Sequence, residues 1–154
     1  MKGFDIGEAL EYTLKSRFKK GSTLLELGSG EGTERLSTHF RMISIEDNPL
    51  FLNLYNSEYY HVNIDPRTHW YNRHEMTFVL GLKYDLILID APRAIPADAR
   101  KGFLHNMDLF NCEIPIFVDD THRQPELELA FEIATKLKRG MEIINDGEKQ
   151  FVIV

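Results

Sequence analysis

Residues 24–32 read Leu-Leu-Glu-Leu-Gly-Ser-Gly-Glu-Gly, and residues 42–46 read Met-Ile-Ser-Ile-Glu. The first run is short and apolar, carries Glu26, and then breaks into glycines at every second position. Between the two runs, residues 33–40 place apolar side chains at helical spacing. The order is therefore strand, glycine turn, helix and a second strand that ends in Glu46. This order predicts half of a nucleotide-binding α/β unit.

The spacing of the glycines indicates which kind of nucleotide fits. Glycine accepts positive φ and lets a ligand lie against the backbone, and an acid ending the second strand can bind both ribose hydroxyls. The dinucleotide fingerprint is G-x-G-x-x-G, but here the third glycine comes one residue early, at Gly32, and Thr33 takes the last place. Glu26 would repel a phosphate and suits a cationic ammonium group. The stretch therefore disfavours a dinucleotide.

The pattern Glu26-x-Gly28-x-Gly30-x-Gly32, followed by Glu46, resembles motif I and the ribose-binding acid of class I S-adenosylmethionine-dependent methyltransferases. The resemblance implies S-adenosylmethionine as cofactor, held at the ends of the first two strands. It implies the following cofactor-binding residues: Glu26, Gly28, Ser29, Gly30, Gly32, Glu46, Asp47, Asp65 and Asp90.

Length and composition set the outer limits. The 154 residues (1–154) predict a single domain, and 43% hydrophobic with 27% charged residues is ordinary for a globular protein. The net charge of −6 and the scattered basic residues argue against a nucleic-acid partner. One cysteine, no leader-like segment and no long apolar run predict a cytoplasmic protein without a membrane partner.

The rest of the chain continues the alternation of helices and strands. Periodicity predicts four helices, at residues 4–18, 50–56, 103–110 and 125–140, the last of which ends at Gly140. It predicts strands at residues 59–64, 84–90 and 114–118. Residues 141–154 predict a hairpin with an Asp-Gly turn, whose second arm is apolar enough to be an interior strand.

Class I methyltransferases resemble this order closely, down to the final hairpin. The implied fold is an α/β three-layer sandwich with a mostly parallel seven-stranded sheet. Its last strand is antiparallel and lies between strands five and six.

Acids follow the fourth and fifth predicted strands. Asp90 ends one and Asp119-Asp120 ends the next, and neighbouring strands lie roughly 4.8 Å apart, so the three carboxylates should converge. This resembles the catechol-type O-methyltransferases, which implies Mg²⁺ or another divalent cation on Asp90, Asp119 and Asp120. The family has Asn where Asp120 stands. In the alternative, Arg93 and Arg123 neutralise the acids as ion pairs.

Without a metal, a general base would have to take the proton of the acceptor hydroxyl. Asp90 or His122 could take the proton, and His122 has the better intrinsic pKa. The candidate catalytic residues are therefore Asp90, Asp119, Asp120 and His122. Trp70 and Tyr71 lie in the polar and aromatic segment 66–74, and either wall the adenine site or plug the sheet edge.

The resemblance implies a methyltransferase that acts on an oxygen of a small-molecule acceptor. The acceptor would lie in an open cleft lined by residues 66–74, 91–101 and 119–124, unless the second subunit of a homodimer supplies a lid. Two alternatives stay open: a non-catalytic module that binds the nucleoside, and an enzyme similar to the aminopropyltransferases.

Overall fold

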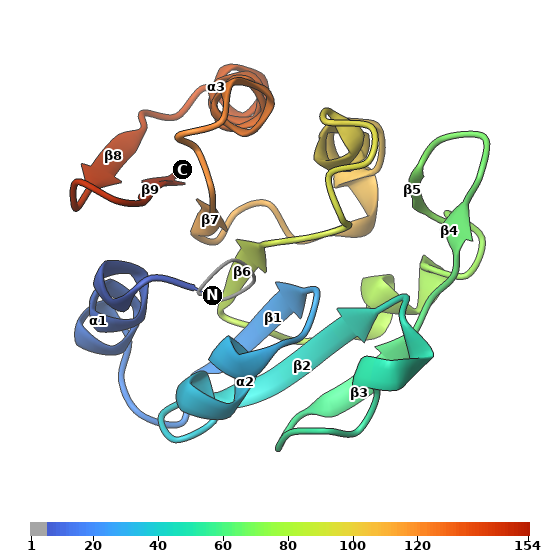
Figure 1. Cartoon of the computed structure of the whole chain (residues 1–154), viewed down its shortest axis with the longest axis horizontal. Helices are drawn as coiled ribbons and strands as arrows, with labels where there is room; N and C mark the ends of the chain where they lie inside the picture. Colours follow the sequence, from blue (N-terminus) through green and yellow to red (C-terminus); the bar gives the residue numbers. More distant parts are fainter. Residues whose placement is uncertain (1–5) are drawn as a thin grey trace.

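A seven-stranded sheet forms the centre of the computed structural model, which describes residues 6–154 (Figure 1). The strand order is β3-β2-β1-β6-β7-β9-β8. The first five of these strands are parallel, whereas β9 is antiparallel to both β7 and β8. The strands are β1 (Thr23–Leu27), β2 (Arg41–Glu46), β3 (Glu58–His61), β6 (Leu86–Ile89), β7 (Ile116–Val118), β8 (Glu142–Asn145) and β9 (Gln150–Ile153).

Helices cover both faces of the sheet, which completes the predicted three layers (Figure 1). Side chains alternate between the faces along each strand: Leu24 packs toward one helical layer, whereas Leu25 packs toward the other. The first layer holds α1 (Glu8–Arg17) and α2 (Glu31–Leu36), and the second holds α3 (Gln124–Leu137) with the 3-10 turns η2 (Thr77–Gly81), η3 (Ala99–His105) and η4 (Met107–Leu109).

The final hairpin lies where the apolar pattern of its second arm places it. β9 is inserted between β7 and β8, with Phe151 and Val152 buried. The predicted fold class, including the position of the antiparallel last strand, is therefore confirmed. Within the described residues, no helix is both long enough and apolar enough to cross a membrane.

Two expectations around β3 are wrong. The helix expected at 50–56 is only a 3-10 turn, η1 (Pro49–Phe51), because Leu50 and Leu54 are exposed and give a helix no face to bury. The strand expected at 59–64 ends at His61. Residues 64 and 65 instead form β4 (Ile64–Asp65), which pairs with β5 (Trp70–Tyr71) in a separate two-stranded sheet.

Three helix boundaries also differ from the expectation. The segment through 103–110 forms η3 and η4 rather than an α-helix. α3 ends at Leu137 rather than continuing to Gly140, because the next residue, Lys138, adopts the left-handed conformation that terminates helices. The helix expected to continue to residue 40 stops at Leu36. The predicted start of the leading helix, residue 4, lies outside the described residues, and α1 begins at Glu8.

Candidate functional site

The glycine turn after β1 approaches the end of β6 very closely. Gly28 has a φ of +90°, and a Cβ added there would lie 2.6 Å from the Cβ of Ala91. Any larger residue would therefore be strained by its own backbone and would also collide with the neighbouring strand. Gly30 is extended, its N–H donates to Thr33 Oγ1 at 3.1 Å, and Gly32 is buried in the first turn of α2.

Glu26 is a buried acid with hydroxyl partners. It is 4% exposed, and its Oε1 accepts hydrogen bonds from Thr33 Oγ1 at 2.5 Å and Ser44 Oγ at 2.6 Å. Burial and, to a smaller extent, the charge of Glu46 raise the pKa of Glu26 to about 7, although the two hydroxyl groups oppose the shift. Within residues 6–154 it forms no ion pair, so a buried carboxyl group stands beside the glycine turn without a cation.

Glu46, at the end of β2, holds the backbone on both sides of it. Its Oε1 accepts from the N–H of Ser29 at 3.0 Å, and its Oε2 accepts from the N–H of Asn48 at 2.8 Å. Burial raises the pKa of Glu46, although the two N–H groups oppose the shift, and the charge of neighbouring Asp47 adds to it. Each carboxylate oxygen keeps a lone pair for a further donor.

The acids that follow β6 and β7 meet as predicted. One oxygen from each of Asp90, Asp119 and Asp120 lies within 4.8 Å of the others. Asp119 is 1% exposed; its Oδ1 accepts from the N–H of Asp120 at 2.8 Å, whereas its Oδ2 has no hydrogen-bond partner within the described chain. Asp90 is partly exposed, and no hydrogen bond from residues 6–154 reaches its carboxylate.

Asp120 differs from the other two acids because two arginines hold it. Its Oδ2 accepts from Arg100 Nη1 and from Arg123 Nη2, both at 3.0 Å. Asp120 has a φ of +58°, a left-handed conformation that Asp tolerates better than most residues, in the turn where this pairing takes place. Lys149 Nζ approaches Oδ1 at 3.9 Å. Asp120 is therefore neutralised within the chain.

The pKa values of the three acids follow from these contacts. Burial and the charge of Asp119 raise the pKa of Asp90 well above its ordinary value, although Arg100 opposes the shift. Burial and the charge of Asp120 raise the pKa of Asp119 to about 6. Burial would also raise the pKa of Asp120, but the hydrogen bond and the charge of Arg100 hold it below its usual range. Asp90 and Asp119 are thus the open pair of the cluster.

Arg100 is the residue that sequence reasoning missed. Its side chain is 9% exposed; Nε donates to the carbonyl oxygen of Pro92 at 3.1 Å, and Nη2 lies 4.0 Å from Asp90. It also lies 3.9 Å from buried Glu126, which has no hydrogen-bond partner within residues 6–154. The alternative based on Arg93 and Arg123 therefore holds for Arg123 alone, because Arg93 is exposed and makes no ion pair in the described structure. No local pattern marks Arg100 in the sequence, because Asp120, which it contacts, lies 20 positions along the chain.

Three of the other predicted residues make no hydrogen bond or ion pair with the acid cluster within residues 6–154. Asp65 is engaged in its own turn, where Oδ1 accepts from the N–H of Arg67 at 2.9 Å. His122 is exposed and has no hydrogen bond within residues 6–154, although it follows Thr121 directly after the acids. Asp47 is half-buried, and its carbonyl oxygen lies 3.1 Å from His61 Nε2.

Trp70 and Tyr71 are each 1% exposed and pack beneath η3. A Cβ added to Gly102 would lie 2.4 Å from Trp70, so that glycine makes room for the ring. The packing supports the interpretation of these rings as a plug. The charges that act on the Tyr71 hydroxyl are those of Glu46, Asp47, Arg100 and Asp90, which all lie at or near strand ends. Burial raises the pKa of Tyr71 well above its ordinary value.

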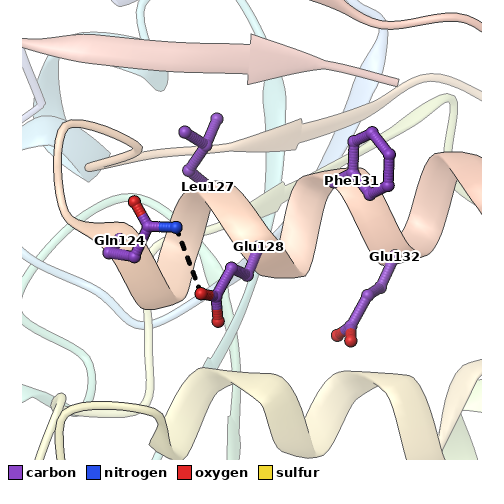
Figure 2. A pocket seen from close by; sticks show the side chains of 5 residues that line it. All are labelled: Gln124, Leu127, Glu128, Phe131 and Glu132. Carbon is purple, nitrogen blue, oxygen red and sulfur yellow. Dashed lines mark hydrogen bonds between the residues drawn. The ribbon is translucent and has the colours of Figure 1, made fainter.

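A surface hollow of about 270 Å³ lies elsewhere, on the outer side of α3 (Figure 2). Its side chains come from one helix, and one hydrogen bond joins them, from Gln124 Nε2 to Glu128 Oε1 at 3.1 Å. Phe131 is 61% exposed there. The hollow has no buried acid, so its chemistry is poorer than that of the strand ends, where we locate the candidate site. Its lining residues are Gln124, Leu127, Glu128, Phe131 and Glu132.

No protein-family model and no curated protein matches the sequence. Among solved structures, the chain is similar to a protein from Staphylococcus aureus provisionally identified as a caffeoyl-CoA O-methyltransferase, with a TM-score of 0.62 and 14% identity over 96% of this chain and 83% of that one. It is also similar to the E. cuniculi Mtq2-Trm112 complex, with a TM-score of 0.57 and 14% identity over 96% and 93%.

A third similar structure is the methyltransferase MycE in complex with Mg, SAH and mycinamycin VI, with a TM-score of 0.56 and 8% identity over 94% of this chain. This chain spans 44% of MycE and 56% of MtNAS, another match. Identities this low show the fold alone. Its sheet order and these matches give the chain the fold of the class I S-adenosylmethionine-dependent methyltransferases.

Proposed function

We propose that this protein is an S-adenosylmethionine-dependent methyltransferase that methylates an oxygen of a small-molecule acceptor. The observation that carries the proposal is the pair of acids at one glycine turn. Glu26 is buried without a cation, and Glu46 ends the neighbouring strand with lone pairs to spare. A cationic nucleoside supplies what each lacks: an ammonium group for Glu26 and ribose hydroxyls for Glu46.

The residues of the glycine turn also fit S-adenosylmethionine. Gly28 has no side chain where the turn approaches Ala91, and the N–H of Ser29 is held by its hydrogen bond to Glu46. When bound, S-adenosylmethionine supplies a methyl group activated on a sulfonium centre. The chain's part is to bind and orient this donor beside Asp90, the partly exposed acid at the next strand end.

In the absence of a cation, Asp90 is the proposed general base. Its pKa is raised by burial and by the charge of Asp119, which makes its carboxylate a better acceptor for the proton of a hydroxyl. As the acceptor oxygen forms its bond to the methyl carbon, that proton moves to the Asp90 carboxylate. His122 is the second candidate, and its exposure gives it room to turn toward the acceptor.

A divalent cation is the further group that these acids would hold. Asp90 and Asp119 have carboxylate oxygens without hydrogen bonds in the described chain, and oxygen ligands suit Mg²⁺, which normally retains several waters. Asp120 fits less well because Arg100 and Arg123 already neutralise it. The cation would lower the pKa of a bound hydroxyl. We propose that Asp90 and Asp119 are its ligands, with Asp120 held in place by the arginines.

Donor binding is the first test. In calorimetry, S-adenosylhomocysteine should bind the wild-type protein, whereas NAD should not. Losing the charged acceptor in Glu46→Ala should cost roughly 1.5–3 kcal/mol, about 10- to 150-fold in affinity. Glu113→Ala, which removes an exposed acid elsewhere, should bind normally. Equal affinity in the two variants would contradict the assignment. Tight binding without turnover of any hydroxylated acceptor would favour a nucleoside-binding module.

The cation is tested separately. Excess chelator should abolish methyl transfer reversibly, and Asp119→Ala should lose both Mn²⁺ binding and activity while Glu113→Ala, an exposed control, loses neither. Activity that persists in chelator would remove the metal and leave Asp90 as the base. In that event, an acceptor panel with and without ionisable hydroxyls would show how much the base contributes.

A further inference from the structure

A continuous set of hydroxyl groups crosses three neighbouring strands on the α2 face of the sheet and converges on Glu26. From one side, Tyr59 OH lies 2.8 Å from Ser29 Oγ, which lies 3.1 Å from Thr33 Oγ1. From the other side, Ser57 Oγ lies 2.6 Å from Ser44 Oγ. Thr33 and Ser44 both end on the same oxygen of Glu26. We call this set the hydroxyl chain; its members are Tyr59, Ser29, Thr33, Ser44 and Ser57.

The direction of every bond in the hydroxyl chain follows from Glu26. Above its pKa of about 7, the Glu26 carboxylate is ionised and only accepts, so Thr33 and Ser44 must donate to it, and each has a single hydroxyl proton. Ser29 must then donate to Thr33, because the Thr33 proton is already used. For the same reason, Tyr59 must donate to Ser29. On the other side, Ser57 must donate to Ser44.

Ser29 is the point where the hydroxyl chain meets the proposed donor site. Its backbone N–H is held by Glu46, and its side chain is held between Thr33 and Tyr59. Tyr59 itself is fixed from behind, because its oxygen accepts from the N–H of Tyr55 at 3.3 Å. The edge strand β3 therefore reaches across β2 to restrain the glycine turn of β1, a connection that strand pairing alone does not provide.

We propose that Tyr59 is a positioning residue for the donor-binding turn and acts through the Ser29 hydroxyl, with Glu26 setting the direction of the bonds. This inference rests on the proposed function. With the Tyr59 proton in place, Ser29 has one arrangement: its oxygen accepts from Tyr59 and its proton goes to Thr33. Without that proton, the Ser29 side chain loses its only donor among these hydroxyls, and the turn must be ordered by the ligand itself.

Tyr60 offers a matched control on the same strand. Its ring faces the opposite side of the sheet, where it stacks on Phe78 with centroids 4.4 Å apart. Tyr59→Phe and Tyr60→Phe thus remove the same atom from adjacent residues, but only the first touches the hydroxyl chain. Calorimetry with S-adenosylhomocysteine at pH 8 should show about a three- to tenfold loss of affinity for Tyr59→Phe and none for Tyr60→Phe.

A double-mutant cycle distinguishes positioning from general weakening. Ser29→Ala should cost a similar factor, and the double variant with Tyr59→Phe should lose no more than the worse single variant, because both break one connection. Turnover at saturating donor should stay near that of the wild type while the donor KM rises. Urea midpoints of Tyr59→Phe and Tyr60→Phe should be similar.

Each outcome decides one question. If wild type fails to bind S-adenosylhomocysteine, the proposed function falls and this inference with it. If wild type binds but Tyr59→Phe binds equally well, or if its loss adds fully to that of Ser29→Ala, only the role of Tyr59 is overturned. A lower urea midpoint with unchanged affinity would likewise assign Tyr59 to stability alone.

Discussion

Two buried tyrosines show how the contribution of a hydroxyl group to stability depends on its surroundings. Tyr71 is 1% exposed and its hydroxyl has no partner within residues 6–154, whereas the hydroxyl oxygen of Tyr84 accepts from the N–H of Asn111 at 2.8 Å. A buried polar atom without a partner has lost its water hydrogen bonds and gained nothing in exchange. The hydroxyl group of Tyr84 therefore stabilises the fold, whereas that of Tyr71 does not.

At this scale we predict opposite results for the two Phe substitutions. In the ligand-free protein, Tyr71→Phe should leave the free energy of unfolding unchanged or raise it by up to about 1 kcal/mol. Tyr84→Phe should lower it by about 1–2 kcal/mol, because the Asn111 N–H loses its acceptor. Urea denaturation of both variants measures the difference. A marked destabilisation by Tyr71→Phe would show that its hydroxyl has a partner, such as a buried water.

At the scale of elements, the contact between the glycine turn and β6 determines how close two strand ends come. Gly28 and Gly21 share nearly the same backbone conformation, with φ of +90° and +92°. A Cβ at Gly28 would collide with Ala91, whereas a Cβ at Gly21 would meet nothing within 4 Å. The two positions thus separate the strain of the backbone from the collision between elements.

Gly21→Ala should cost roughly 1–2 kcal/mol of unfolding free energy, the penalty for a side chain at positive φ. Gly28→Ala should cost about 1–3 kcal/mol more, because overpacking adds to the strain. The double variant with Ala91→Gly should recover most of that additional loss, since it removes the colliding methyl group. Thermal denaturation of the four proteins is sufficient, and equal losses at the two glycines would refute the collision.

For the whole molecule, Glu26 links stability to pH. Burial raises its pKa to about 7, so the folded state keeps a proton that the unfolded chain releases near pH 4.5. The stabilisation is complete below the unfolded pKa and is lost as pH rises through the folded one. The charge of Glu46 acts in the same direction as burial, and Glu26 makes no ion pair within residues 6–154 that would offset it.

The ligand-free protein should therefore be less stable at pH 8 than at pH 5.5, by about 2 kcal/mol from Glu26 alone. Glu26→Gln should remove this contribution, because glutamine does not titrate, whereas Asp90 and Asp119, whose pKa values are also raised, keep theirs. Urea midpoints of both proteins at the two pH values provide the measurement. A wild-type protein that gains stability between pH 5.5 and 8 would show that Glu26 ionises as readily in the fold as out of it.

Sequence alone determined the sheet and the edge at which three of its acids gather. Continuous apolar runs such as residues 86–89 are buried on both faces in the structure, and the apolar second arm of the last hairpin correctly predicted an interior strand. Periodicity and glycine spacing carry this information because they are properties of neighbours along the chain. The convergence of Asp90, Asp119 and Asp120 followed as well, since parallel strands end at one edge.

Only the tertiary structure decided how each acid is partnered. Arg100 reaches Asp120 across 20 positions, Ser44 reaches Glu26 across 18, and Tyr59 reaches Ser29 across 30. No local pattern encodes such contacts, because they depend on which strands lie side by side and which way each side chain points. The same limit explains the missing helix at 50–56, whose apolar residues had helical spacing but no surface to bury against.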